Sequence, residues 1–235
     1  MKFFIHTIWY WFIVFTFVPL HFFVGLFCIF LPDPKTKHRT LARLFIKFIS
    51  FNMGLKIKVI GIEHIPKNSP CIVMCNHTSL IDILVMVMAV PFRLNFIAKR
   101  ELVWVPFIGL DMLFEGDFLI NRQNAKEAKR CLDTVEQRLN ENGKVLIFPE
   151  GTRSKTGKLL PFKRGAFKLS VASEAKIIPC YIEGSSKIVK KGSLLARPGT
   201  VTVTFNPAIE PPKSKKRVDL ENTLNETFDC INSYY

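Results

Sequence analysis

The segment from Phe3 to Leu31 contains no Asp, Glu, Lys or Arg, and it constrains the fold more than any other part of the chain. At about 1.5 Å per residue, a continuous helix of this length would exceed the ~30 Å hydrocarbon core of a bilayer. Pro19 and Gly25 interrupt the segment, which leaves two geometries: one kinked spanning helix, or a helical hairpin inserted into a single leaflet. We therefore predict a membrane-anchoring segment, in preference to the buried helix of a soluble protein.

Basic residues are distributed unevenly around this segment. Only Lys2 precedes it, whereas five basic residues follow within the next turns, at Lys35, Lys37, Arg39, Arg43 and Lys47. The positive-inside rule therefore predicts a membrane-associated protein whose remaining chain faces the cytoplasm. A secretory signal peptide is disfavoured, because the apolar core is too long and no small-residue cleavage site follows it.

Residues 33–54 mix basic and apolar side chains at helical spacing. This pattern predicts an amphipathic helix, which could lie on anionic headgroups or pack as an ordinary surface helix on the domain. We assign residues 1–54 to a membrane-anchoring helical segment and residues 55–235 to an α/β domain.

The formal net charge of +14 indicates anionic partners, such as membrane lipid, phosphorylated metabolites, an acidic carrier or nucleic acid. Nucleic-acid binding would explain the charge but not the apolar N-terminal segment. The six cysteines include no Cys-x-x-Cys pair. We interpret them as buried free thiols, so neither a zinc site nor a disulfide framework is predicted from them.

Short apolar runs alternate with helical patterns beyond residue 55. Runs typical of strands lie at 56–60, 71–75, 92–98, 117–120, 145–148, 177–182 and 201–205, and the clearest soluble helix lies at 125–139. The alternation predicts an α/β fold with a central, mostly parallel sheet covered by helices. Functional side chains of such sheets gather where the strands end at their carboxyl edge.

A polar motif, Asn-His-Thr-Ser-Leu-Ile-Asp, directly follows the run at 71–75. Five residues of α-helix would place His77 and Asp82 about 140° apart, so the two side chains can meet only if a helix begins between them. Thr78 or Ser79 could serve as its N-cap. Asp82 would then accept a ring N–H from His77 and leave the other nitrogen free as a base. The alternative is that Asp82 closes a capping box with Ser79 and has no chemical role.

A second polar cluster, Glu150, Gly151, Thr152 and Arg153, follows the run at 145–148. The arginine offers a planar set of donors suited to phosphate, and the glycine lets the backbone approach a ligand closely. The alternative for Arg153 is a surface side chain that is solvated or paired with Glu150.

Further cations follow other predicted strands. Arg122 is a second candidate phosphate ligand, and Lys99 and Lys163 are weaker candidates. Each is more often a surface charge than a ligand when it is considered singly. Several cations converging on one crevice would indicate an anion to be held there.

With these clusters, the sequence resembles the membrane-associated glycerolipid acyltransferases, whose best-known members are 1-acyl-glycerol-3-phosphate acyltransferases. Order and spacing match over about residues 55 to 210 through four motifs: His77 to Asp82, Gly116 to Arg122, Phe148 to Ser154, and Ile178 to Cys180. Asn121 stands where the family often has Asp before its arginine.

The resemblance implies acyl transfer from acyl-CoA or acyl-carrier protein to the free hydroxyl of lysophosphatidic acid, giving phosphatidic acid, without a metal or other cofactor. His77 would be the general base and Asp82 would orient it. Six residues would hold the substrate: Glu150, Gly151, Thr152, Arg153, Arg122 and Lys99. Two alternatives stay open, a sibling enzyme that uses glycerol 3-phosphate or another lysophospholipid, and a non-catalytic membrane lipid-binding protein.

Overall fold

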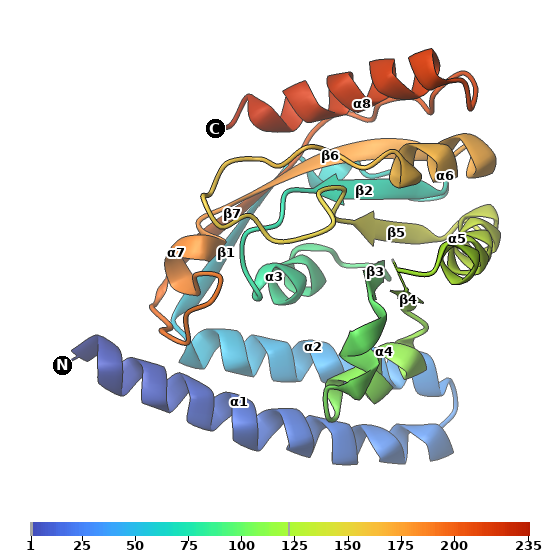
Figure 1. The fold of residues 1–235 in the computed structure, drawn as a ribbon. Coiled ribbons are helices and arrows are strands. Elements are labelled where there is room, and N and C mark those ends of the chain that lie inside the picture. Colours follow the sequence, from blue (N-terminus) through green and yellow to red (C-terminus); the bar gives the residue numbers. More distant parts are fainter. Residues whose placement is uncertain (1, 122) are drawn as a thin grey trace.

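A seven-stranded sheet forms the centre of the computed structural model, which describes residues 2–121 and 123–235 (Figure 1). The strand order is β1-β7-β6-β2-β5-β3-β4. β2 to β6 run parallel to one another, β7 is antiparallel to β6, and β1 is parallel to β7. The predicted mostly parallel sheet is therefore confirmed. The strands are β1 Leu55–Ile60, β2 Cys71–Cys75, β3 Asn95–Lys99, β4 Phe118–Ile120, β5 Lys144–Ile147, β6 Lys176–Glu183 and β7 Gly199–Phe205.

Helices cover both faces of the sheet, as Figure 1 shows. One face carries α1 Lys2–Phe27, α2 Pro34–Asn52, α3 Asp82–Ala89 and α4 Ile108–Glu115. The other carries α5 Ala125–Asn140, α6 Gly165–Ser173 and α8 Arg217–Asn232. A short helix, α7 Ser185–Ile188, follows β6, and 3-10 turns lie at Cys28–Phe30, Ile62–His64 and Arg100–Trp104.

β2 illustrates why this chain forms a doubly covered sheet. All of its residues are buried, and alternate side chains enter different hydrophobic clusters. Val73 packs in the cluster that contains Val85 of α3, whereas Met74 packs in the cluster that contains Val135 of α5. A strand buried on both faces needs a continuous apolar run, which is the pattern that the sequence shows.

The N-terminal segment forms a helical hairpin, but its second arm differs from the one expected. α1 continues through Pro19 and Gly25 and ends at Phe27, and the chain then turns back into α2, which lies beside α1 (Figure 1). Asp33, with φ 52°, and Pro34 at the start of α2 make the turn. Of the two geometries considered for the apolar segment, the structure therefore has the single helix and not a hairpin within the segment, because one proline removes only one backbone donor from a long helix.

The hairpin packs against the α/β domain. Tyr10 and Ile13 of α1 belong to the same buried cluster as Val73, and so does Ile49 of α2. The Trp11 indole Nε1 donates to the Leu194 carbonyl at 2.7 Å. Of the two placements considered for residues 33–54, the structure therefore has the helix packed on the domain. The boundary after residue 54 stays a prediction.

The opposite side of α1 is exposed and apolar. The stretch Phe4–Phe30, which consists of most of α1 and the 3-10 turn after it, is long and apolar enough to cross a membrane. Only 17% of the residues in its most apolar part are buried. Its exposed side chains include Phe4, Ile8, Phe12, Phe15, Phe23 and Phe27. An unpaired apolar surface of this kind marks an interaction site for lipid or protein.

Candidate active site

The predicted site residues do meet at the carboxyl edge of the sheet. β2 lies between β5 and β6, and all three strands are parallel, so the segments that follow them emerge at one edge. His77 follows β2, and the cluster from Glu150 to Arg153 follows β5. The structure thus brings together two motifs that are far apart in the sequence.

His77 and Asp82 form the central contact of this edge. The His77 Nδ1 lies 2.8 Å from the Asp82 Oδ2. α3 begins at Asp82 with Ile81 at the N-cap position, so the helix does begin between the two residues, but neither Thr78 nor Ser79 is its cap. The backbone N–H groups of Thr78 and Ser79 both donate to Asp82 Oδ2 at 2.9 Å, which holds the chain in a turn ahead of the helix.

One carboxylate oxygen therefore serves both roles considered for Asp82. Its Oδ2 accepts the capping-type bonds of the turn and also faces the imidazole. The Asp82 side chain is fully buried, and among the described residues no donor reaches its Oδ1. A fixed carboxylate on Nδ1 favours the tautomer in which Nδ1 carries the proton and Nε2 keeps a lone pair for proton abstraction.

The imidazole of His77 is held on its face as well as at its edge. Its ring stacks on Phe148, with centroids 4.0 Å apart and an interplanar angle of 15°. The side chain of His77 remains 17% exposed, so it is open to a ligand. Stacking and the Asp82 contact together fix the ring before any substrate binds, which is the condition for efficient general-base chemistry.

Glu150 supports the backbone of His77. Its Oε1 accepts the His77 N–H at 2.7 Å, and its Oε2 accepts the Leu160 N–H at 2.9 Å. The Ser154 N–H donates to the His77 carbonyl at 2.8 Å, so residues 150–154, in the loop after β5, hold the backbone on both sides of residue 77. Burial raises the pKa of Glu150 to about 7, although its bonds to the two backbone N–H groups act in the opposite direction.

Replacing Glu150 with glutamine should lower the free energy of unfolding by about 1–3 kcal/mol, because an amide turns its NH2 group towards one of the two buried N–H donors. The wild-type glutamic acid adds stability below its ordinary pKa of 4.5, and this contribution is lost as the pH rises to about 7. Urea unfolding should therefore show a larger difference between the two proteins at pH 5 than at pH 8. The exposed Glu63→Gln is the control, and a difference independent of pH would contradict the raised pKa.

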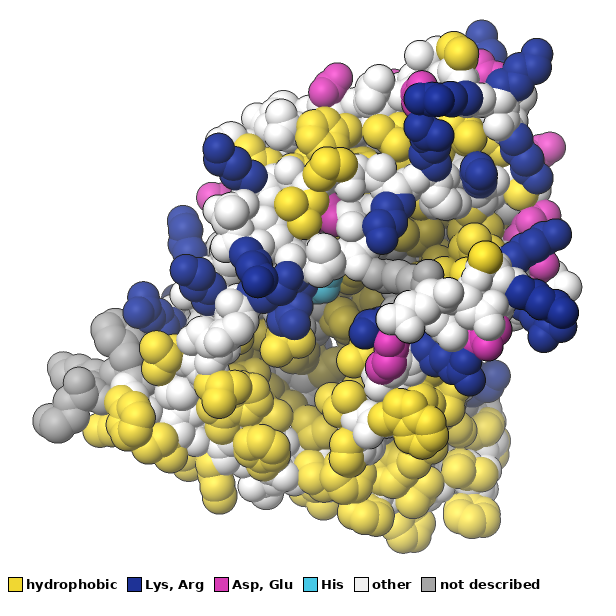
Figure 2. Space-filling model, viewed as in Figure 1, with side chains coloured by type: hydrophobic (Ala, Val, Ile, Leu, Met, Phe, Trp, Pro, Cys, Tyr) yellow, Lys and Arg dark blue, Asp and Glu magenta, His cyan; other side chains and the backbone are white. Residues whose placement is uncertain are grey.

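Cationic groups border the cluster from Glu150 to Arg153. Gly151 has φ 72°, a backbone angle that favours glycine, and it faces the end of the Lys163 side chain, since a Cβ there would lie 3.0 Å from the Lys163 Nζ. The Lys191 Nζ donates to the Arg153 carbonyl and lies 3.5 Å from the Thr152 Oγ1. Figure 2 shows Lys and Arg side chains gathered around a hollow on this side of the molecule.

Arg153 is partly exposed, and its guanidinium forms no ion pair with Glu150, whose oxygens are occupied by backbone N–H groups. Lys99 ends β3 at the same edge, but it is 60% exposed and pairs with Glu101 at 2.8 Å. Its role as a substrate ligand stays a prediction. Arg122, the second candidate phosphate ligand, lies outside the described residues.

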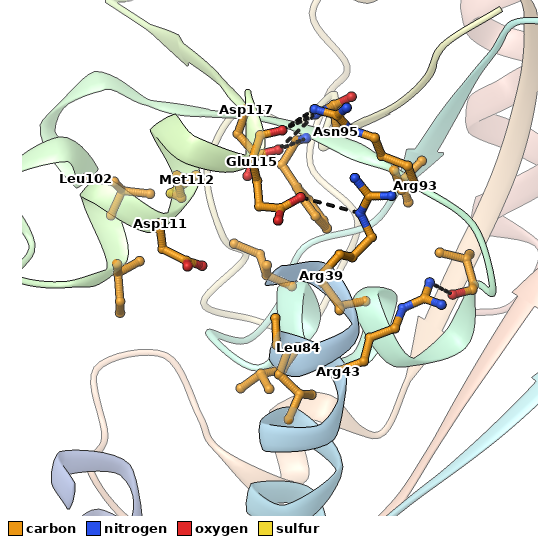
Figure 3. A pocket seen from close by; sticks show the side chains of 18 of the residues that line it. Arg39, Arg43, Leu84, Arg93, Asn95, Leu102, Asp111, Met112, Glu115 and Asp117 are labelled. Carbon is orange, nitrogen blue, oxygen red and sulfur yellow. Dashed lines mark hydrogen bonds and ion pairs between the residues drawn. The ribbon is translucent and has the colours of Figure 1, made fainter. Parts of the chain in front are cut away.

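An apolar pocket of about 300 Å³ lies between α2, α3, β3 and α4 (Figure 3). Its walls include Leu80 and Ile83, which lie close to Asp82 in the sequence, as well as Leu102 and Met112. Charged groups also line the pocket, namely Arg39, Arg43, Arg93, Asp111, Glu115 and Asp117. The pocket therefore adjoins the helix that carries Asp82.

Three contributions to the site were missed in the sequence. Phe148 supports the imidazole, and Ser154 donates to the His77 carbonyl. Lys191, which follows β6 in the chain, donates to the Arg153 carbonyl. Phe148 and Ser154 lie at the two ends of the motif from Phe148 to Ser154, but their contacts with His77 depend on how β2 and β5 pair. Lys191 follows no polar motif, and nothing in the local pattern identifies it.

A comparison with protein families matches the acyltransferase family over residues 56–183. The chain belongs to this acyltransferase family. The match includes β2, β5 and the polar segments that follow both strands. The resemblance inferred from the four sequence motifs is therefore confirmed.

Individual relatives agree with the family assignment. The chain is 37% identical over 166 residues to human 1-acyl-sn-glycerol-3-phosphate acyltransferase beta, which covers 70% of this chain and 60% of the relative. It is 31% identical over 190 residues to the coconut (Cocos nucifera) 1-acyl-sn-glycerol-3-phosphate acyltransferase, covering 80% of this chain and 59% of the relative. The matched part thus spans little more than half the length of these relatives.

A solved structure extends the similarity to nearly the whole chain. The crystal structure of PlsC, the 1-acyl-sn-glycerophosphate acyltransferase of Thermotoga maritima, aligns with a TM-score of 0.81 and 26% identity. The alignment covers 99% of this chain and 94% of the other. The acyltransferase fold here therefore includes the N-terminal helices as well as the sheet.

Proposed function

We propose that the protein transfers an acyl group from acyl-CoA or acyl-carrier protein to the free hydroxyl of 1-acyl-glycerol 3-phosphate, giving phosphatidic acid. The observation that carries this proposal is the 2.8 Å contact between His77 Nδ1 and the buried Asp82 carboxylate, at a sheet edge bordered by cations. The names of the relatives support this choice of acceptor.

The chemistry needs one base and no covalent intermediate. His77 Nε2 takes the proton of the acceptor hydroxyl as its oxygen attacks the thioester carbonyl, and the buried Asp82 carboxylate stabilises the imidazolium that forms. The tetrahedral intermediate then collapses, the carbon–sulfur bond breaks, and His77 returns its proton to the departing thiolate. The products are the ester and the free thiol, so atoms and charges balance.

The cations at the cluster from Glu150 to Arg153 would hold the acceptor's phosphate. Arg153 has a partly exposed guanidinium, and Lys163 and Lys191 lie against the backbone of the same loop. Bidentate contacts from arginine suit a phosphate group. The phosphate would then sit close to the His77 loop, with the acceptor hydroxyl directed at the imidazole.

Arg153→Ala should raise the KM for the acceptor by about 10–100-fold, because a hydrogen bond to a charged group contributes about 1.5–3 kcal/mol. Arg153→Lys should recover part of this loss by restoring the charge without the planar donors. Initial rates at varied acceptor and donor concentrations separate the two KM values. Lys155→Ala, an exposed neighbour, is the control. A rise confined to the donor KM would contradict the phosphate role.

The apolar pocket and the exposed face of α1 fit a lipid substrate. The pocket of about 300 Å³ is lined in part by Leu80 and Ile83, which are close to Asp82 in the sequence, and it would take an acyl chain. The Phe-rich face of α1 would enter one leaflet, since the other face of that helix is packed on the domain through Tyr10 and Ile13. The catalytic edge would then work on the cytoplasmic side of the membrane.

Purified protein in detergent should be supplied with acyl-CoA or acyl-carrier protein and a panel of acceptors: lysophosphatidic acid, glycerol 3-phosphate and other lysophospholipids. We expect lysophosphatidic acid to be consumed fastest, with phosphatidic acid identified by its mass. Preference for another acceptor would assign the chain to a sibling activity and contradict the choice made here. Absence of any acylated product with both donors would favour a non-catalytic lipid-binding protein.

A further inference from the structure

Three polar side chains converge where α1, α2 and α4 meet, outside the site described above. They are His21 of α1, His38 of α2 and Asp111 of α4. The His38 Nε2 lies 2.9 Å from the Asp111 Oδ1, and the His21 Nδ1 lies 3.9 Å from the same oxygen. One potential ligand atom from each residue lies within 4.8 Å of the others.

The ring of His38 is oriented by a second carboxylate. Its Nδ1 donates to the Glu115 Oε1 at 2.8 Å, and the Arg39 Nε lies 3.4 Å from the other Glu115 oxygen. The side chain of His38 is only 5% exposed. A carboxylate on one nitrogen of an imidazole, with the other nitrogen directed at further donors, is the usual arrangement of histidines that ligate metals.

Space is left open beside the His38 Nε2. Gly25 of α1 faces it, and a Cβ at that position would lie 3.0 Å from the His38 Nε2. A cavity of about 160 Å³ is lined by Gly25, His38 and Asp111. Among the described residues, no hydrogen-bond partner reaches the buried His21 Nε2. A histidine inside so apolar a helix is costly to place there unless it has a partner or a function.

We propose that His21, His38 and Asp111 bind one divalent transition-metal ion of the zinc type. Two imidazoles and one carboxylate are a ligand set that zinc accepts, with metal–ligand distances of about 2.0–2.2 Å. Tetrahedral bonds of that length separate the ligand atoms by roughly 3.3–3.6 Å. The observed separations of 2.9 and 3.9 Å lie on either side of this value.

The ion would tie the N-terminal hairpin to the wall of the apolar pocket. It joins α1 and α2 to α4, and both Asp111 and Glu115 of α4 also line that pocket. The cavity next to Gly25 leaves the fourth position to a water molecule. The ion would therefore stabilise the packing of α1 against α4, and the chemistry at His77 proceeds without it.

The test uses the full chain in detergent, treated with a chelator and then titrated with Co²⁺ and afterwards with Zn²⁺. We expect the visible absorption of tetrahedral Co²⁺ to saturate at one equivalent per chain, and Zn²⁺ to displace it. His38→Ala and His21→Ala should each weaken binding at least about 100-fold. Glu115→Gln, which alters the carboxylate that His38 shares with Arg39 and leaves the three proposed ligands in place, should weaken it by about 10–100-fold. His6→Ala is the control, because His6 also lies on α1 but contacts the Ala196 carbonyl.

Circular dichroism and a monodisperse elution profile must show that each variant is folded. Asp111→Asn provides a second variant of unchanged shape, which should lose binding while the hairpin stays in place. Absence of saturable Co²⁺ binding to the wild-type chain would overturn the proposal and leave His38 as a protonated partner of two carboxylates. Binding that survives in both histidine variants would also overturn it. Neither readout depends on acyl transfer.

Discussion

Replacing His77 with alanine is expected to lower kcat for acyl transfer by about 10²–10⁴, the usual contribution of a positioned general base. The imidazole is the basic group that Asp82 orients at 2.8 Å and Phe148 supports by stacking. The acceptor KM should change little, because the acceptor's phosphate is assigned to Arg153, Lys163 and Lys191. Initial rates with lysophosphatidic acid at saturating acyl donor measure both quantities.

His64→Ala is the matched control for this experiment. His64 is likewise partly buried, and its Nδ1 lies 2.8 Å from the Phe205 carbonyl, away from the His77 loop. Its replacement should leave kcat within a few-fold of the wild-type value, apart from any loss of folded protein. Near-normal turnover by a folded His77→Ala protein would remove the basis of the mechanism.

Asp82→Asn should lower kcat by about 10²-fold or more while preserving much of the local fold. An asparagine can place its oxygen at the Oδ2 position, where it still accepts the Thr78 and Ser79 N–H groups. In that orientation the same oxygen faces His77 Nδ1, but the amide carries no charge to stabilise the imidazolium that forms. Rates and thermal unfolding measured on the same preparation separate catalysis from stability.

Asp82→Ala distinguishes orientation from simple folding effects. This change removes the acceptor of the turn as well as that of the imidazole, so we expect a further loss of stability of about 1–3 kcal/mol for the buried N–H groups left without a partner. The asparagine variant should therefore be the more stable of the two but still slow. Full activity of Asp82→Asn would show that Asp82 is a structural cap with no part in the reaction.

The parts of the fold that were predictable are those set by local periodicity. β2 matches the apolar run at 71–75, and α5, Ala125–Asn140, matches the helical pattern at 125–139. Each pattern records which side chains are buried, because the strand is covered on both faces and the helix on one. The path of the hairpin was not predictable in this way. The sequence separates α1 from a second helix within residues 33–54, but α1 is apolar over most of its length, so its pattern gives no sign of which side packs on the domain.

The site divides along the same line. The contact between His77 and Asp82 is local, and helix geometry alone showed that a helix must begin between them. Glu150 was expected to bind substrate, whereas the structure places its two oxygens on the His77 and Leu160 N–H groups. Such long-range contacts depend on the order of strands in the sheet, which residue spacing does not specify. The assignment of Glu150 as a substrate ligand thus stays a prediction.

Release of thiol from the acyl donor, measured with and without lysophosphatidic acid, tests the central claim most directly. Acyl-CoA and acyl-carrier protein should each be tried with the purified chain in detergent. We expect thiol to appear only when the acceptor is present, in an amount equal to the phosphatidic acid formed. A burst of one thiol per chain without acceptor would reveal a covalent acyl-enzyme, and no release from either donor with acceptor present would show that His77 performs no acyl transfer.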